Sequence, residues 1–151
     1  MVEVHVSKLD YKFKHTIRVR WKEADVQGIA YFGSYLDFID VAQVEYFRKL
    51  GILTHNPDQR KDFDLSSVKV TLEYKKPAKI DELIDIYFKV KKIGNSSITK
   101  VAEIYRANTD VLLTTAEMIS VNFDSELEKS KKIPNEIRSI INKFENCSTN
   151  A

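Results

Sequence analysis

The amino-acid sequence predicts an α+β fold in which an antiparallel sheet of about five strands wraps around one long central helix, with a short helix near the C-terminus. Three observations lead to this prediction. Segments of alternating apolar and polar residues, typical of half-buried strands, lie on both sides of one long helical segment. That segment is apolar over most of its circumference, as buried helices are. Finally, 151 residues suffice for one core and not comfortably for two, so we expect a single domain over residues 1–151.

The first strand and the central helix are adjacent in the sequence. Alternation predicts a strand over residues 13–21, with its apolar side formed by Phe13, Ile17, Val19 and Trp21. The helix is expected over residues 33–50, because no glycine or proline interrupts it beyond Gly33. Ser34 can cap its first turn, and Gly51 follows as a C-terminal stop. Only a narrow polar stripe remains on this helix, so we expect the sheet to wrap around it.

Four more strands follow a polar link at residues 56–60. They are expected at residues 68–75, 84–90, 98–107 and 111–123. The first two are joined at Pro77, and turn residues at 94–96 and 108–110 separate the others. These strands predict an antiparallel meander, with a core at about residues 12–123. Pro134 then opens the short helix at about 134–145, whose one side carries Ile137, Ile140, Ile141 and Phe144.

Composition argues against several classes of protein. The 24 Lys and Arg residues nearly cancel the 22 Asp and Glu residues, so we expect neither a nucleic-acid nor a membrane partner. The single cysteine, Cys147, excludes an intrachain disulfide, and no segment approaches the length of an apolar membrane span. These features predict a cytoplasmic protein. His5, His15 and His55 lack companions at metal-ligand spacing, so no metal site is expected.

A partner subunit is predicted from the architecture. A single sheet covers only part of so apolar a helix, and an antiparallel sheet also leaves an edge strand to be paired. The simplest partner is an identical chain, so we expect a homo-oligomer.

Two segments resemble the 4-hydroxybenzoyl-CoA thioesterase family, including its YbgC-like branch. In the first, residues 20–35, the positions that match the family signature are Asp25, Gly28, Ile29, Tyr31 and Tyr35. The second, residues 74–83, contains Tyr74, Pro77 and Ala78 before an acidic entry to the next strand. The likeness spans roughly residues 12–123, and two landmarks in order are far more specific than one short motif.

The resemblance implies a hotdog fold whose dimer joins two sheets edge to edge, often as a dimer of dimers, with active sites at the subunit interface. It also implies an acyl-CoA substrate, with coenzyme A entering only as part of that substrate and no metal or redox cofactor. One position departs from the family. Phe32 stands where relatives carry histidine or tyrosine, so a hydrogen bond from that side chain is lost.

Asp25 is the expected catalytic residue. Thioester hydrolysis needs an activated water or a carboxylate nucleophile, and Asp25 suits either role. The alternative is that Asp25 only shapes a turn, which aspartate and glycine commonly do. Gly28 is expected to permit an unusual backbone conformation or a close approach, or to be a plain turn glycine. Tyr31 and Phe32 line the acyl pocket if the family geometry holds, or else belong to the core.

The remaining site residues are expected from the partner subunit and from basic clusters. By analogy with the family, backbone N–H groups near Ser66 and Ser67 of a partner subunit would bind the oxyanion, although both serines could simply begin a strand. Lysines that could hold the coenzyme A phosphates are Lys75, Lys76, Lys79, Lys91, Lys92 and Lys100. Of these we select Lys91 and Lys92, although lysine runs on strands are usually solvated surface.

The sequence therefore predicts an acyl-CoA thioesterase. An acyl-carrier-protein thioesterase is a second possibility, because the basic residues from Lys75 to Lys79 could dock an acidic carrier. A non-catalytic acyl-CoA-binding module is a third. No Gly-x-Ser-x-Gly motif occurs, so the serine-hydrolase type of thioesterase is excluded.

Overall fold

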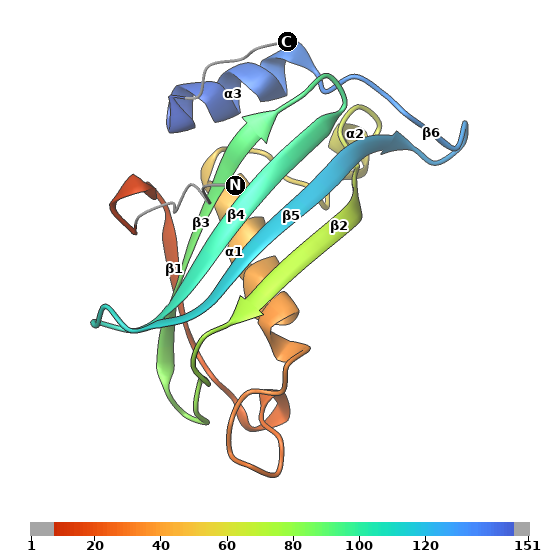
Figure 1. Ribbon diagram of the computed structural model, residues 1–151. Coiled ribbons are helices and arrows are strands. Elements are labelled where there is room, and N and C mark those ends of the chain that lie inside the picture. The colour runs from red at the N-terminus through yellow and green to blue at the C-terminus, as the bar shows by residue number, and fades with distance from the viewer. Residues whose placement is uncertain (1–7, 147–151) are drawn as a thin grey trace, which may run out of the picture.

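The computed structural model describes residues 8–146. The elements in chain order are the 3₁₀ turn η1 (Lys8–Asp10), β1 (Lys14–Arg18), the 3₁₀ turn η2 (Trp21–Glu23), α1 (Ser34–Lys49), α2 (Pro57–Arg60), β2 (Leu65–Tyr74), β3 (Leu83–Ile93), β4 (Ser97–Arg106), β5 (Leu112–Asp124), β6 (Lys129–Ser130) and α3 (Asn135–Glu145). The α+β fold with one long helix and a short C-terminal helix is confirmed (Figure 1). Cys147 and His5, which bear on the disulfide and metal expectations, lie outside the described residues.

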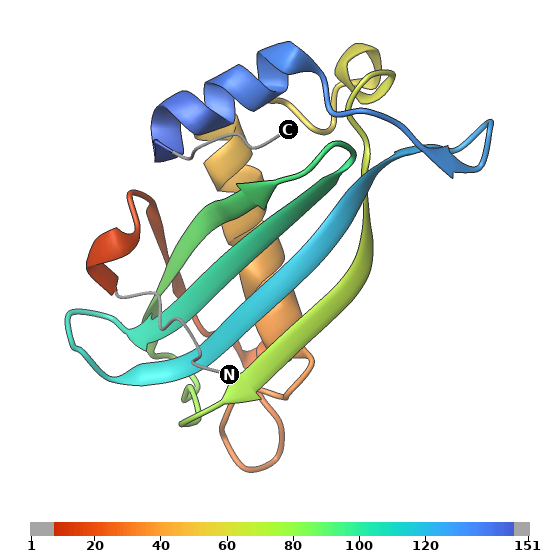
Figure 2. The ribbon, with the colours of Figure 1, turned by 45° about the horizontal axis from the view of Figure 1, so that its top comes forward.

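The sheet is antiparallel, with the strand order β1-β3-β4-β5-β2, and the two-residue strand β6 pairs with β5 outside this order. Figure 2 shows α1 running across the concave face of this sheet. The meander prediction holds for β3, β4 and β5 and is wrong for β2. That strand pairs with β5 at one edge, and β1 pairs with β3 at the other. The loop 75–82 therefore carries the chain from the edge strand β2 to β3, which lies beside the opposite edge strand β1.

The core lies between α1 and the sheet. Phe38, Ile39, Ala42, Tyr46 and Phe47 of α1 are buried against the inner side chains of β3 and β4. Gly51 has a φ of +77°, which confirms it as the stop of the helix. The capping prediction for Ser34 is wrong. Gly33 occupies the N-cap position, and the Ser34 hydroxyl instead donates a hydrogen bond to the Glu23 carbonyl oxygen at 2.9 Å.

Two segments differ from the expected pattern. The first strand pairs with β3 only as far as Arg18, after which the chain turns into η2. Trp21, predicted on the buried side of that strand, is therefore 87% exposed. The polar link at 56–60 contains the short helix α2, whose first turn is capped by the Asn56 side chain. The C-terminal helix packs as predicted, with Ile137 and Ile141 buried.

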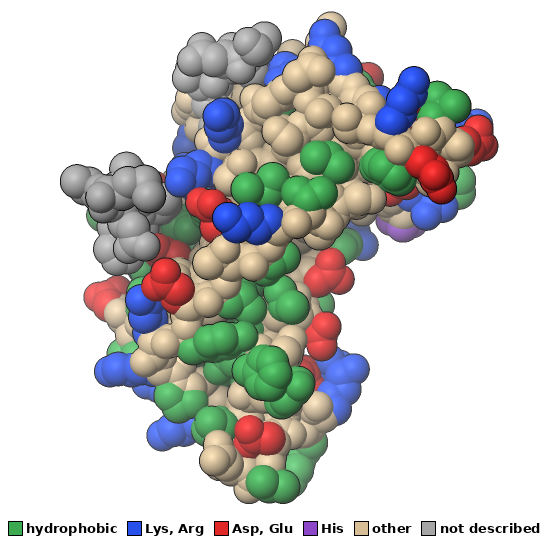
Figure 3. Space-filling model, turned by 45° about the vertical axis from the view of Figure 1, so that its right-hand side comes forward, with side chains coloured by type: hydrophobic (Ala, Val, Ile, Leu, Met, Phe, Trp, Pro, Cys, Tyr) green, Lys and Arg blue, Asp and Glu red, His purple; other side chains and the backbone are tan. Residues whose placement is uncertain are grey.

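One face of the chain keeps exposed apolar side chains. The edge strand β2 exposes Val68 and Val70, and the neighbouring side of α1 exposes Leu36 and Val41. Figure 3, which turns this side toward the viewer, shows hydrophobic side chains gathered over the middle and lower part of the face. The central helix is thus only partly covered by its own sheet.

Candidate active site

The site is built on a tight turn that precedes α1. The Asp25 N–H donates to the Ile29 carbonyl oxygen at 2.9 Å, and the Gly28 N–H donates back to the Asp25 carbonyl oxygen at 3.0 Å. The loop 75–82 holds this turn from outside. Ala30 donates to the Ala78 carbonyl oxygen at 2.8 Å, and the Ile80 N–H donates to the Gly28 carbonyl oxygen at 3.0 Å. Both loops therefore fix the position of the Asp25 backbone.

Gly28 has a φ of +75°. A Cβ atom at this position would meet nothing within 4 Å, so close approach is not the reason for glycine here. The positive φ is the reason, because side-chain-bearing residues rarely adopt it. Of the explanations predicted for Gly28, the unusual backbone conformation is the one that fits this geometry.

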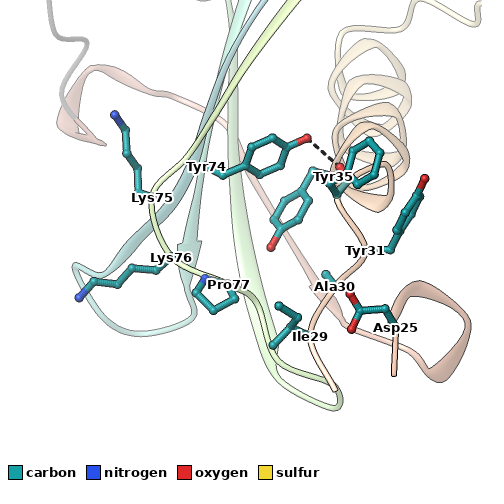
Figure 4. A pocket seen from close by; sticks show the side chains of 10 residues that line it. Asp25, Ile29, Ala30, Tyr31, Tyr35, Tyr74, Lys75, Lys76 and Pro77 are labelled. Carbon is teal, nitrogen blue, oxygen red and sulfur yellow. Dashed lines mark hydrogen bonds between the residues drawn. The ribbon is translucent and has the colours of Figure 1, made fainter. Parts of the chain in front are cut away.

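The Asp25 side chain is exposed at the rim of a pocket, and Figure 4 shows its carboxylate pointing toward Ala30. Its Oδ1 accepts a hydrogen bond from the Gln27 N–H at 2.8 Å. This bond is the turn-forming role predicted as the alternative to catalysis. It engages one of the two carboxylate oxygens, so the same residue can hold the turn and present the other oxygen to a substrate.

The pocket has a volume of about 370 Å³. It is lined by Asp25, Ile29, Ala30, Tyr31, Phe32, Tyr35, Tyr74, Lys75, Lys76 and Pro77. Tyr31 and Phe32 are 49% and 64% exposed, so they are wall residues of this pocket and not part of the core. Their ring centroids lie 4.4 Å apart. The lining is mostly apolar, with one carboxylate at the rim.

Tyr35 and Tyr74 form the inner wall, and sequence reasoning did not assign either of them to the site. Their rings meet edge to face with centroids 5.2 Å apart. The Tyr35 hydroxyl accepts a hydrogen bond from the Ala78 N–H at 3.1 Å, and burial raises the pKa of this phenol above its usual value. Both residues were matching positions of the family landmarks, which was the available signal for their presence here.

The structure does not bring Ser66 and Ser67 to this pocket within one chain. They lie near the start of β2, and Tyr74 is its last residue. At about 3.3 Å per residue, Ser66 is roughly 26 Å from Tyr74 along the strand. Ser66 and Ser67 could reach a pocket only if it belonged to a second copy of the chain. In the prediction from the sequence, they act from a partner subunit in this way.

Of the six candidate lysines, Lys79 lies in the loop 75–82, where its backbone bridges to Ile29. The other five separate into three groups. Lys91 and Lys92 lie near the far end of β3 and are absent from the pocket lining, so the structure does not bring the selected pair to the pocket. Lys75 and Lys76 line its rim, with side chains directed outward in Figure 4. Lys100 is 2% exposed and is not a surface residue.

No metal centre or membrane span emerges from residues 8–146. Within this part of the chain, no three His, Cys, Asp or Glu side chains cluster in a way that could hold a metal ion. None of the described helices has the length and apolar character needed to cross a membrane.

Comparisons with known proteins fit this geometry. The sequence-family model of the thioesterase-like superfamily matches residues 19–141 of this chain. Among curated relatives, the acyl-CoA thioester hydrolase YbgC of Escherichia coli O157:H7 is 26% identical over 130 residues, covering 83% of this chain and 92% of the relative. The acyl-CoA thioesterase YbgC of Helicobacter pylori strain 26695 is 26% identical over 88 residues, 58% of this chain and 63% of the relative.

Solved structures share the fold. A 1,4-dihydroxy-2-naphthoyl-CoA thioesterase from Synechocystis superposes with a TM-score of 0.79 at 19% identity, covering 85% of this chain and 94% of that one. A thioesterase from Thermus thermophilus, solved with coenzyme A and zinc, superposes with a TM-score of 0.78 at 15% identity. This match covers 92% of this chain and 98% of that one. These likenesses support the hotdog architecture.

Proposed function

Because the chain belongs to the thioesterase-like superfamily, we propose that it hydrolyses acyl-CoA thioesters to a free carboxylic acid and coenzyme A. One observation carries this proposal. The exposed Asp25 carboxylate is held by a rigid turn at the rim of a mostly apolar pocket. The names of the curated relatives, acyl-CoA thioester hydrolases, agree with that chemistry.

Asp25 can act as a general base or as a nucleophile. As a general base it takes a proton from a water whose oxygen attacks the thioester carbonyl, and the C–S bond then breaks to release coenzyme A as its thiol. As a nucleophile its carboxylate attacks the thioester carbonyl, and the C–S bond breaks to release the coenzyme A thiolate, which takes up a proton. Water then hydrolyses the resulting mixed anhydride to the free acid and the Asp25 carboxylate. Single turnovers in ¹⁸O-labelled water test for the nucleophilic route. Label in the Asp25 carboxylate indicates an anhydride that is hydrolysed at the aspartyl carbonyl.

The oxyanion donors come from a second copy in this proposal. If two β2 edges pair antiparallel across a two-fold axis near Val70, Ser66 of the partner subunit lies opposite Tyr74, beside the pocket. The exposed Val68 and Val70 on that edge support such a pairing. Sedimentation equilibrium at assay concentration checks it. A dimer or tetramer supports the arrangement, and an active monomer contradicts it.

Lys75 and Lys76 take the role of binding the coenzyme A phosphates. They stand at the pocket rim and point outward, where the nucleotide of a bound thioester would extend. The pantetheine arm would then pass between this rim and Tyr31. We also propose a cytoplasmic location, with which an acyl-CoA substrate is compatible.

The test is the Asp25→Asn variant with Asp110→Asn as its control, because Asp110 is exposed on the β4–β5 turn outside the pocket lining. Asp25→Asn should lower kcat by roughly a hundredfold to ten-thousandfold, whereas Asp110→Asn should not change it. Equal activity of Asp25→Asn and the parent would refute the catalytic role. Hydrolysis rates of the same acyl groups on coenzyme A and on acyl carrier protein identify the preferred carrier. Binding of acyl-CoA without turnover would favour the non-catalytic module.

A further inference from the structure

Tyr74 lies across the inner end of the pocket. It is the last residue of β2, and its ring reaches from the sheet toward the start of α1 (Figure 4). Its hydroxyl donates a hydrogen bond to the Phe32 carbonyl oxygen at 2.8 Å, and its ring packs against Tyr35. A single side chain therefore bridges the edge strand and the helix entrance.

The two tyrosines of the inner wall are held very differently. Tyr35 is 3% exposed and belongs to the core, with its hydroxyl bonded to the Ala78 backbone. Tyr74 is 48% exposed, and its hydroxyl is held by one neutral hydrogen bond. That bond is a weak restraint, and the edge-to-face contact with the Tyr35 ring adds a second restraint of similar size, so Tyr74 can rotate out of the wall at a modest cost. Its removal from the inner wall would leave the core intact.

Beyond Tyr74 the same face of β2 continues as an apolar strip. Leu72 and Val70 follow at intervals of two residues, so their side chains share the face of Tyr74. Val70 pairs with Met118, which pairs with the buried Lys100. The strip from Tyr74 to the row of Val70 is roughly 13 Å long. It offers apolar surface to an acyl chain that passes Tyr74.

We propose that Tyr74 determines the acyl length that the pocket accepts. This inference rests on the proposed thioesterase function and deepens it. With its hydroxyl on the Phe32 carbonyl, Tyr74 confines the acyl group to the aromatic-walled pocket, which suits short or single-ring acyl groups. Longer chains must displace Tyr74 to reach the strip of Leu72 and Val70. Tyr74 is thus a specificity-determining residue and not a catalytic one.

The experiment compares the parent with Tyr74→Phe and Tyr74→Ala on butyryl-, benzoyl-, octanoyl-, lauroyl- and palmitoyl-CoA. The parent should favour butyryl- or benzoyl-CoA. Tyr74→Phe keeps the ring and loses the hydrogen bond, so the ratio of kcat/KM for lauroyl-CoA to that for butyryl-CoA should rise by about twofold to tenfold. Tyr74→Ala should raise it further. An unchanged ratio in Tyr74→Ala, or an equal loss for every acyl-CoA, would overturn the proposal.

Binding measurements keep this test separate from that of the proposed function. Thioether analogues of the same acyl-CoAs are not hydrolysed, and calorimetry gives their Kd for each variant. If the parent hydrolyses no acyl-CoA, the proposed function fails. The Tyr74 inference is then decided by Kd alone, and it stands only if Tyr74→Ala shifts the binding preference toward the longer analogues.

Discussion

Replacing Lys100 by methionine should stabilise the folded protein at neutral pH. Lys100 lies on the inner face of β4 and is 2% exposed. Its ammonium donates a hydrogen bond to the Gln43 side chain of α1. Burial lowers the pKa of this ammonium from 10.5 to about 8, and the nearby Asp40 carboxylate offsets that effect only in part. Methionine has a similar length and carries no charge to bury.

The magnitude follows from the two pKa values. At about 1.4 kcal/mol per pH unit, the difference between 10.5 and about 8 corresponds to about 3 kcal/mol of destabilisation while the lysine is charged. The lost hydrogen bond to Gln43 offsets about 1 kcal/mol of the gain on substitution. We therefore expect Lys100→Met to raise the free energy of unfolding by about 2 kcal/mol at pH 7.

The pH dependence has a definite sign. Below pH 8 the lysine is charged in both the folded and the unfolded state, so the folded state carries the full cost of burial. Between pH 8 and 10.5 the folded protein loses this proton while the unfolded chain retains it, so the stability contributed by this group rises with pH. The advantage of Lys100→Met should shrink over this range.

Urea unfolding of the parent and Lys100→Met at pH 7, 8, 9 and 10 measures this difference, and other titrating groups cancel between the two proteins. Lys92→Met, at an exposed position of β3, is the matched control and should show no such trend. A Lys100→Met protein that is less stable than the parent at pH 7, with a pH-independent difference, would show that the Gln43 and Asp40 contacts outweigh the cost of burial.

Two further substitutions test the turn that holds Asp25 and a buried hydrogen-bond cluster at Asn122. Gly28→Ala should cost about 1 kcal/mol of stability through its positive φ, and should lower kcat/KM about tenfold as the Asp25 turn shifts, measured by urea unfolding and steady-state kinetics. Asn122→Ala should cost about 2–4 kcal/mol in urea unfolding, because the buried amide donates to the Asp62 and Lys132 carbonyl oxygens and accepts from the Asp64 N–H. A loss below 1 kcal/mol would contradict the reasoning for Asn122, and unchanged kinetics would contradict that for Gly28.

The elements of the fold could be predicted from side-chain periodicity, whereas their arrangement could not. Alternation shows which face of a strand is buried, and this located β3, β4 and β5 to within a few residues. It carries no information on which strand is the neighbour, so the place of β2 beside β5 was missed. Trp21 was misplaced for a related reason. Its alternation with Arg20 continues past the last residue that pairs with β3.

The candidate site was predictable where it is contiguous in sequence. Asp25, Gly28, Tyr31 and Phe32 lie within eight positions and share one turn, so a motif contains them all. Tyr74 and Lys76 reach the same pocket from a segment more than 40 residues later, through the bridge between Ile29 and Lys79. Lysine runs carry no positional signal of their own. Lys91, Lys92 and Lys100 therefore looked equivalent in the sequence, although Lys100 is buried and Lys91 faces Glu117.

The turn-forming and catalytic roles of Asp25 can be separated experimentally, because they use different oxygens. Oδ1 accepts the Gln27 N–H, and an asparagine carbonyl oxygen can accept the same bond. Asp25→Asn should therefore keep the turn and lose the base or nucleophile, whereas Asp25→Ala should lose both. Equal stabilities of Asp25→Asn and the parent, with a loss of about 1 kcal/mol for Asp25→Ala, would identify the turn contribution. If both variants are equally inactive while only alanine is destabilised, the activity depends on the carboxylate itself. Activity that follows stability across the two variants would instead make Asp25 a turn residue alone.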